Sequence, residues 1–305
     1  MKRTILIFGV SSFVGSNLLE VLKNDFRIIG TYHHTPVTIP GVTCIPCDVL
    51  KKEYVSSLVA RFRPDICIYA AGLSSLKECS LNQKKSDALN SSAAMNCCTA
   101  SERHDAKFIY ISSGFVLAGE DTLYREGETP FPNTVYGNSL SSTEFHIQRS
   151  SLNYLIFRCS PLYGRSFSPT HPNWFEYLES SLAKNETIDV DDSVVTGFLD
   201  VKLMVNILKV VIDLDVKNRL LHVSSSDFMT RYEFAKLYAR IFKKDENLVQ
   251  KVPGTFPLDK NRSHSEKANY YFKLNTFNIE SMTGIKMPTV ETSLNLTRKR
   301  LGLES

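Results

Sequence analysis

A glycine-bearing turn follows the first apolar run of the chain, Thr4–Phe8, and leads directly into a helical segment. Residues 9–15 read Gly-Val-Ser-Ser-Phe-Val-Gly. Small residues let the backbone turn tightly there, so that a pyrophosphate can approach amide groups at a helix N-terminus. The strict G-x-G-x-x-G spacing is absent, since Val10 and Ser11 follow Gly9 and position 12 is a serine, and a purely structural turn is the alternative. The predicted dinucleotide phosphate site consists of Gly9, Ser11, Ser12, Phe13, Val14 and Gly15.

Two later strand ends also carry small or polar residues. Asp48 and Val49 close the third apolar run, and Ala70, Ala71 and Gly72 close the fourth. Ligands of doubly wound sheets bind outside the carboxyl ends of the strands, so we assign these residues to the same coenzyme site. Asp48 would accept a hydrogen bond from an adenine amino group, and a helix N-cap is its alternative role.

The second apolar run ends in Gly30-Thr-Tyr-His-His34. About 20 residues after the glycine turn, NAD-binding sheets place a carboxylate for the ribose diol. No Asp or Glu stands here, so a 2′-phosphate would meet no repulsion, and Thr31, His33 or His34 could bind it. The sequence therefore favours NADP over NAD, although no arginine is present either. The alternative is that both histidines are simply exposed at the start of a loop.

These residues require a sheet that brings the strand ends together. Short apolar runs of β type alternate with amphipathic segments through the first half of the chain. The expected strands are 4–8, 27–31, 42–47, 66–70, 108–112 and 154–158, and the expected helices are 16–23, 53–61 and 88–102. Parallel neighbours need crossover connections, so this alternation predicts an α/β fold with a Rossmann-type doubly wound parallel sheet.

The alternation loosens after Gly164. The expected elements are helices at 174–184, 201–214 and 230–242, a strand at 220–224 and a surface loop at 253–267. Thr230 and Glu233 have the spacing of a capping box. We expect a dinucleotide-binding domain of residues 1–164, joined by 196–224, and a smaller C-terminal substrate-binding domain of residues 165–195 and 225–305.

Composition excludes several classes of protein. The 305 residues are 43% hydrophobic, and 36 basic against 32 acidic residues give a net charge of +4. These values indicate a globular chain with a large core and exclude a disordered, coiled-coil or disulfide-scaffold protein. The small charge calls for neither nucleic acid nor an anionic membrane, and no apolar run reaches the roughly 20 residues of a membrane span. Seven cysteines without a signal-peptide pattern favour a cytoplasmic protein.

Cys44 and Cys47 invite a metal or redox interpretation, with His33 and His34 as further ligands. The two cysteines lie along an expected strand and not at a helix N-terminus, where a thiolate would be stabilised. We therefore expect ordinary half-buried thiols and no metal site. A hydrolase is disfavoured because no serine or cysteine lies in a G-x-S-x-G elbow.

The motifs, taken in order, resemble a known family. Beyond the glycine turn and Ala70-Ala71-Gly72, they are Asn90, Ser112-Ser113, Val116, Tyr124, Glu126, Pro132, Tyr136-Gly137, Glu144, the segment from Arg158 to Gly164, and Asn173-Trp-Phe175. They resemble the extended short-chain dehydrogenase/reductases, and within these the dTDP-4-dehydrorhamnose reductase-like branch. The resemblance covers most of the chain. It implies an NAD(P)-dependent reductase or epimerase of a nucleotide-linked sugar, Asn90 at the coenzyme site and a homodimer.

By position, the resemblance implies that Tyr136 gives a proton to the substrate carbonyl and that Ser113 orients this carbonyl. In the family, a lysine four residues after the tyrosine lowers its pKa and holds the nicotinamide ribose. That position is Leu140 here. A free tyrosine titrates at about pH 10, and leucine supplies neither a charge nor a donor. Because a reduction starts from the protonated tyrosine, the lost ribose contact matters more than the lost charge.

Two hypotheses follow. The first is a working NADP-dependent enzyme, favoured by Tyr136 and Ser113. The second is a catalytically impaired relative, favoured by Leu140 and Ser12, that binds a dinucleotide or sugar nucleotide as a regulatory subunit.

Substrate contacts are expected from the second domain, in the cleft that faces the strand ends. Arg165 offers a cation for a phosphate, Asn173 a polar group and Trp174 a flat ring. Each of the three could equally be an ordinary loop residue.

Overall fold

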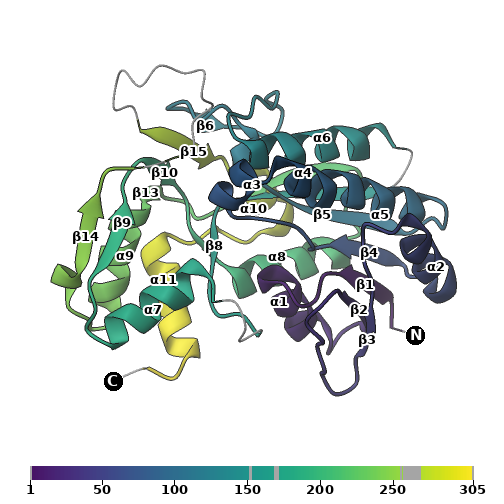
Figure 1. The fold of residues 1–305 in the computed structure, drawn as a ribbon, viewed down its shortest axis with the longest axis horizontal. Helices are drawn as coiled ribbons and strands as arrows, with labels where there is room; N and C mark the ends of the chain where they lie inside the picture. Colours follow the sequence, from purple (N-terminus) through teal and green to yellow (C-terminus); the bar gives the residue numbers. More distant parts are fainter. Residues whose placement is uncertain (1, 151–152, 168–171, 255, 257–268, 304–305) are drawn as a thin grey trace.

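A seven-stranded parallel sheet forms the centre of the larger lobe in the computed structural model, which describes residues 2–150, 153–167, 172–254, 256 and 269–303 (Figure 1). The strand order is β12-β7-β5-β4-β1-β2-β3. The strands are β1 (Thr4–Phe8), β2 (Arg27–Tyr32), β3 (Thr43–Pro46), β4 (Ile66–Tyr69), β5 (Lys107–Ser113), β7 (Tyr154–Cys159) and β12 (Arg219–Val223). The predicted doubly wound parallel sheet is thus confirmed.

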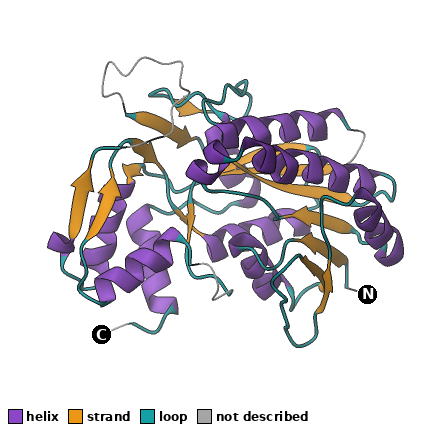
Figure 2. Ribbon diagram, viewed as in Figure 1, coloured by secondary structure: helices purple, strands orange, loops and turns teal. Residues whose placement is uncertain are grey.

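Helices cover both faces of this sheet, as Figure 2 shows. One face carries α1 (Phe13–Leu22), α8 (Val201–Asp213) and α10 (Phe277–Thr283), and the other α2 (Lys52–Phe62), α5 (Ala93–Glu102) and α6 (Val135–Arg149). Side chains of a strand alternate between the two faces. In β1, Ile5 and Ile7 therefore pack with α1 and α8, whereas Leu6 and Phe8 pack with α2 and α5. Both faces are buried, which accounts for the continuous apolar runs of the sequence.

The smaller lobe has its own core. Its helices are α7 (Trp174–Ala183), α9 (Arg231–Ile241) and α11 (Val290–Arg300), and aromatic side chains such as Phe175, Phe234 and Tyr238 fill the space between them. Beside them, β9 (Ile188–Asp191) pairs with β14 (Val249–Val252). A further sheet contains β13 (Met229–Thr230), β10 (Val194–Thr196), β15 (Tyr270–Leu274) and β6 (Leu123–Tyr124). The capping box of Thr230 and Glu233 is present at the start of α9.

Short elements connect these parts. They are α3 (Leu76–Leu81), α4 (Gln83–Ser86), η1 (Asp87–Ser92), η2 (Gly114–Val116), η3 (Glu246–Leu248), β8 (Leu162–Tyr163) and β11 (Leu199–Asp200). The segment 88–102 is helical as expected, but its first part belongs to η1, a turn of π-helix, and α5 begins only at Ala93. Most of the loop expected at 253–267 lies outside the described residues. None of the described helices combines the length and apolarity that crossing a bilayer requires.

Candidate functional site

The turn between β1 and α1 needs glycine at both of its ends. Gly9 has a φ of +91°, and a Cβ atom there would lie 2.7 Å from the backbone nitrogen of Ala71. A Cβ atom at Gly15 would lie 2.0 Å from the carbonyl oxygen of Gly9. Any side chain at these positions would force the backbone apart, so both glycines are required by close approach.

Ser12 shows why the middle glycine of the usual pattern is dispensable. Its φ of −76° is open to any residue, and its hydroxyl accepts a hydrogen bond from the amide of Gly15 as the N-cap of α1. The same hydroxyl donates to the carbonyl oxygen of Ala70 at 2.8 Å, which fixes the turn to the end of β4. Ser11 and Phe13 beside it are half-exposed. The N-terminus of α1 can therefore receive an anion from the open side.

The end of β2 holds the turn from the other side. The carbonyl oxygen of Thr31 accepts from the amides of Gly9 and Val10, and its buried hydroxyl lies 3.3 Å from the Gly9 nitrogen. Thr31 is thus directed at the turn and not at solvent. His33 and His34 are exposed, with ring centroids 3.7 Å apart. The absence of a carboxylate from this strand end suits a 2′-phosphate, and the role of the histidines stays a prediction.

Asp48 and Val49 lie beyond β3. The Asp48 carboxylate accepts from the amide of Leu50 at 3.0 Å, and Val49 is buried in the core. The alternative role of Asp48 as a helix N-cap is wrong, because Lys51 is the N-cap of α2. The adenine contact of Asp48 stays a prediction.

Asn90 anchors the segment that follows β4. Its side chain accepts from the amide of Leu73 at 2.7 Å and donates to the Leu73 carbonyl oxygen at 2.9 Å. Its own carbonyl oxygen accepts from the hydroxyls of Tyr110 and Thr143. A Cβ atom at Gly72 would lie 2.7 Å from Asn90 Oδ1. Asn90 therefore ties the Ala70–Gly72 segment to β5 and α6 from within the π turn.

Tyr136 and Ser113 come together at the carboxyl end of β5. Ser113 ends the strand, and Tyr136 lies in the first turn of α6, which Thr134 caps by accepting from the amide of Gly137. A Cβ atom at Gly137 would lie 2.1 Å from the carbonyl oxygen of Phe115, so α6 approaches the segment after β5 as closely as backbones can. This close approach sets the phenol beside the serine.

The environment of Tyr136 keeps its phenol protonated. Burial raises the pKa of Tyr136 well above its usual value, and the thiols of Cys79 and Cys159 raise it further. A hydrogen bond with Ser113 acts in the opposite direction. None of these leading contributions comes from a lysine or an arginine in the described part of the chain.

Leu140 lies one helical turn after Tyr136 and is 4% exposed. It packs into the core on the α5 and α6 face of the sheet, so the position is built as an apolar one. The adjacent Ser139 hydroxyl donates to the carbonyl oxygen of Tyr136 at 2.8 Å and lies within 3.4 Å of Asn90 Nδ2 and Ser86 Oγ. A neutral hydroxyl network thus borders the position where the family places a cation.

A buried ion pair between side chains of α6 and β7 lies next to β5, and no sequence pattern indicates a role for it. Arg158 and Glu144 are each 1% exposed and form a bidentate ion pair, with Nη2 and Oε2 2.7 Å apart. Ser112 donates to Glu144 at 2.5 Å. His222 lies across from Arg158 in the β7–β12 pairing, and among the described residues the ring has only weak contacts with the backbone of Tyr124 and Asn275. Burial and the positive charge of Arg158 lower the pKa of His222 to about 3, so the ring is neutral.

The three candidate substrate contacts all make structural interactions. Arg165 donates to both carboxylate oxygens of Glu179. Asn173 caps α7 and also donates to the carbonyl oxygen of Gly164 at 2.9 Å. The centroid of the Trp174 ring lies 5.7 Å from that of the Phe234 ring, and the guanidinium of Arg231 lies over the face of Trp174. Their role toward a substrate stays a prediction.

All seven cysteines are free, and Cys44 and Cys47 are half-buried and buried, respectively. Within the described ranges, no group of three or more His, Cys, Asp or Glu side chains is placed to hold a metal ion.

Three comparisons with known proteins bear on this site. A dTDP-4-dehydrorhamnose reductase of Aggregatibacter actinomycetemcomitans is 24% identical over 261 residues, which are 83% of this chain and 82% of that protein. Methionine adenosyltransferase 2 subunit beta of Pongo abelii is 22% identical over 298 residues, 95% of this chain and 87% of that protein. The crystal structure of a dTDP-4-dehydrorhamnose reductase from Bacillus anthracis in complex with NADP matches with a TM-score of 0.82, at 23% identity and with complete coverage of both chains.

The seven-stranded parallel sheet, with the glycine turn between β1 and α1, defines an α/β protein of the Rossmann-type doubly wound class. The model of the family described as RmlD substrate binding domain matches residues 1–302, and the chain belongs to this family. The resemblance inferred from the sequence motifs is thereby confirmed.

Proposed function

We propose that this protein is an NADP-dependent reductase of a nucleotide-linked sugar, in which Tyr136 donates the proton. The observation that carries the proposal is the placement of a glycine turn at a helix N-terminus and of a buried phenol at the carboxyl ends of β1 and β5, the two strands that flank β4 in the sheet. The names of the relatives support this substrate class, since they include dTDP-4-dehydrorhamnose reductases. The same fold would also accommodate NAD as the coenzyme, or an epimerase reaction on the nucleotide-linked sugar.

The residues present fit a dinucleotide. A Cβ atom at Gly9 or Gly15 would fill the cradle of the turn. Ser12 takes up the amide of Gly15, and the half-exposed Phe13 and Val14 are the residues of the first turn of α1 that a pyrophosphate could approach. Ala70 and Ala71 keep the neighbouring strand end small. His33 and His34 offer donors at the end of β2, where no carboxylate repels a 2′-phosphate.

When bound, NADPH supplies a hydride to the carbonyl carbon of the substrate. The residues of the chain handle the proton: the Ser113 hydroxyl donates a hydrogen bond that orients the carbonyl oxygen, and Tyr136 transfers its phenolic proton to that oxygen. Tyr136 then regains a proton from solvent. The raised pKa of Tyr136 keeps the phenol in the protonated form that this direction requires.

The test compares two tyrosine variants with dTDP-4-dehydrorhamnose as the substrate. Tyr136→Phe removes only the phenolic hydroxyl, so we expect kcat to fall by roughly 10²–10⁴-fold while coenzyme affinity by calorimetry stays the same. Tyr177→Phe, at an exposed site on α7, is the matched control and should keep full activity. Equal kcat in Tyr136→Phe and wild type would refute the proposed role.

The second candidate is a regulatory subunit that binds the coenzyme without turning it over. Leu140 favours it, as do relatives named methionine adenosyltransferase 2 subunit beta. Calorimetric binding of NADPH with no oxidation on any 4-keto nucleotide sugar would select this candidate. Turnover that depends on Tyr136 would exclude it.

A further inference from the structure

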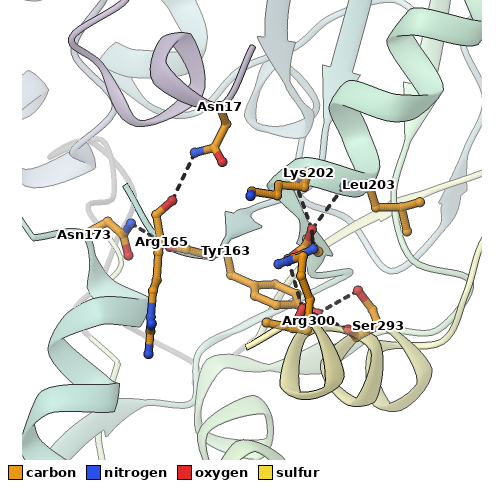
Figure 3. Close-up of polar contacts among 11 residues, drawn as sticks. Asn17, Tyr163, Arg165, Asn173, Lys202, Leu203, Ser293 and Arg300 are labelled. Atoms are coloured by element: carbon orange, nitrogen blue, oxygen red, sulfur yellow. Dashed lines mark hydrogen bonds and ion pairs between the residues drawn. The ribbon is translucent and has the colours of Figure 1, made fainter. Parts of the chain in front are cut away.

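A cavity between the two lobes lies apart from Tyr136. Its volume is about 260 Å³, and its wall is formed by α1 and α8 of the larger lobe, α7 and α11 of the smaller lobe and the chain around Arg165 (Figure 3). None of the described residues in this wall belongs to the glycine turn or to the Tyr136–Ser113 pair. A ligand here would contact both lobes without occupying the coenzyme turn.

Three positively charged side chains line the cavity, and only two of them form an ion pair with a carboxylate of a described residue. Arg300 forms a bidentate ion pair with Asp200, with contacts of 2.9 and 2.6 Å. Arg165 is paired in the same way with Glu179. Lys202, in the first turn of α8, forms no ion pair with a described residue. The wall therefore carries an excess of positive charge at Lys202.

The Lys202 ammonium is held at the cavity by an aromatic ring. Its Nζ atom lies 5.3 Å from the centroid of Phe167, another wall residue. The face of the Phe167 ring attracts the ammonium group. It does not accept hydrogen bonds from the three N–H groups of the ammonium, as the oxygen atoms of an anion would. Arg300 likewise uses two of its five donors on Asp200, so further N–H groups remain for a bound oxygen.

Asn17 contributes an unsatisfied acceptor to the same wall. Its Nδ2 atom donates to the carbonyl oxygens of Phe13 at 2.9 Å and Arg165 at 3.1 Å, and these two acceptors fix the orientation of the amide. Oδ1 is therefore the atom on the other side, and it is buried without a hydrogen-bond partner. In Figure 3 this oxygen points away from Arg165, toward the side of the cavity where Lys202 lies. Buried acceptors are rarely left without a donor.

We propose that this cavity binds a small phosphate ester that carries a hydroxyl group. The phosphate would lie at Lys202 and Arg300, since lysine binds phosphate as a point charge and arginine by directed N–H donors. The hydroxyl would donate to Asn17 Oδ1, and the carbon skeleton would pack on Phe167 and Val201, which are apolar wall residues. Because Asn17 also holds the Phe13 carbonyl oxygen, a ligand here bridges the two lobes directly behind the coenzyme turn.

The test is isothermal titration calorimetry of the coenzyme-free protein with glycerol 3-phosphate and with methyl phosphate, which lacks the hydroxyl. We expect glycerol 3-phosphate to bind about fivefold more tightly, the effect of one hydrogen bond to a buried acceptor. Lys202→Gln should weaken glycerol 3-phosphate binding by roughly tenfold or more. Lys209→Gln, on the same helix but paired with Asp25 and Asp213, is the control and should leave the affinity unchanged.

Three results would overturn the proposal: no heat with glycerol 3-phosphate at millimolar concentration, unchanged binding in Lys202→Gln, or equal affinity for the two probes. Unchanged binding in Lys202→Gln would place the phosphate at the glycine turn instead. Displacement of bound glycerol 3-phosphate by dTDP would identify the phosphate as that of a sugar nucleotide, and simultaneous binding would identify a separate phosphate ester. The titration uses neither coenzyme nor turnover, so its outcome is independent of the reductase activity.

Discussion

Leu140 determines how the phenol of Tyr136 can work. Leu140 lies in the core, and no lysine or arginine of the described residues is among the main influences on the pKa of Tyr136, so burial is the largest of them and raises this pKa. A phenol that stays protonated is ready to give a proton to a ketone. The reverse oxidation starts from the phenolate, which is scarcely populated at neutral pH when the pKa is raised, so we expect oxidation of the product to be slow at that pH.

Leu140→Lys should restore the missing cation. We expect a lower pKa of Tyr136, because an ammonium within one helical turn favours the phenolate. The kcat of the wild-type reduction should then be flat through about pH 9, whereas that of Leu140→Lys should fall on the alkaline side as the phenol loses its proton. Faster oxidation of the product at neutral pH should accompany this fall.

The measurement is a pH profile of kcat in both directions, with nicotinamide coenzyme affinity recorded alongside. Leu140→Met keeps the volume and apolarity of the site, and it should retain the wild-type profile. Identical profiles for Leu140→Lys and wild type, with unchanged affinity, would mean that another group already fills the role of the lysine.

His222 predicts an acid-sensitive fold. The folded state holds this ring neutral with a pKa of about 3, whereas in the unfolded chain it titrates at 6.5. The unfolded state therefore binds more protons below pH 6.5, and stability present above that pH is lost as pH falls toward 3. From pH 7 to pH 5 this single group should lower the free energy of unfolding by about 2 kcal/mol.

Urea unfolding at the two pH values tests this expectation. His222→Leu removes the titrating ring, so the loss between pH 7 and pH 5 should shrink by about 2 kcal/mol. His104→Gln removes an exposed histidine and should leave the loss as in wild type. An unchanged pH dependence in His222→Leu would show that the ring is protonated in the folded protein.

The β1–α1 turn is the part of the proposed coenzyme site where backbone segments approach one another most closely. Gly15→Ala would place a methyl group 2.0 Å from the Gly9 carbonyl oxygen, and neither backbone can give way without opening the turn. We expect a loss of stability of roughly 1–3 kcal/mol and a coenzyme affinity at least about tenfold lower. Gly127→Ala, in open space on an exposed loop, should change stability by no more than about 0.5 kcal/mol. Equal affinities of the two variants for NADPH, measured by calorimetry, would show that the turn does not contribute to coenzyme binding.

Most elements of the sheet could be predicted from the sequence because both of its faces are buried. The expected strand at 4–8 matches β1, and those at 27–31 and 154–158 each end within one residue of β2 and β7. The π turn Asp87–Ser92 could not be predicted, since it depends on the contacts that Asn90 makes with Leu73, Tyr110 and Thr143. Such partners are distant in sequence and leave no local pattern.

The capping role of Asn173 shows a related limit. The sequence offered it as a polar substrate contact, and the structure gives its side chain to the amide of Glu176 and the carbonyl oxygen of Gly164. An Asn three residues before a Glu at the start of a helix is a capping-box signal that could have been read. Arg165 has no such signal, because Glu179 becomes its partner only when α7 forms.

The two lobes of the molecule could be predicted from the sequence, as one large parallel sheet and a smaller C-terminal domain. The cavity between the two lobes could not be predicted. The cavity lined by Asn17, Lys202 and Arg300 joins positions nearly 300 residues apart in the chain, which no periodicity reveals. The division into residues 1–164 with 196–224, and 165–195 with 225–305, stays a prediction, as does the homodimer.

The most direct measurement of the central claim is the fate of a labelled hydride. NADPH dideuterated at C4 of the nicotinamide, incubated with this protein and dTDP-4-dehydrorhamnose, should yield a sugar product with one deuterium at the former ketone carbon by mass spectrometry. The rate of label transfer should fall by roughly 10²–10⁴-fold in Tyr136→Phe. A product without deuterium, or undiminished transfer in Tyr136→Phe, would contradict the account.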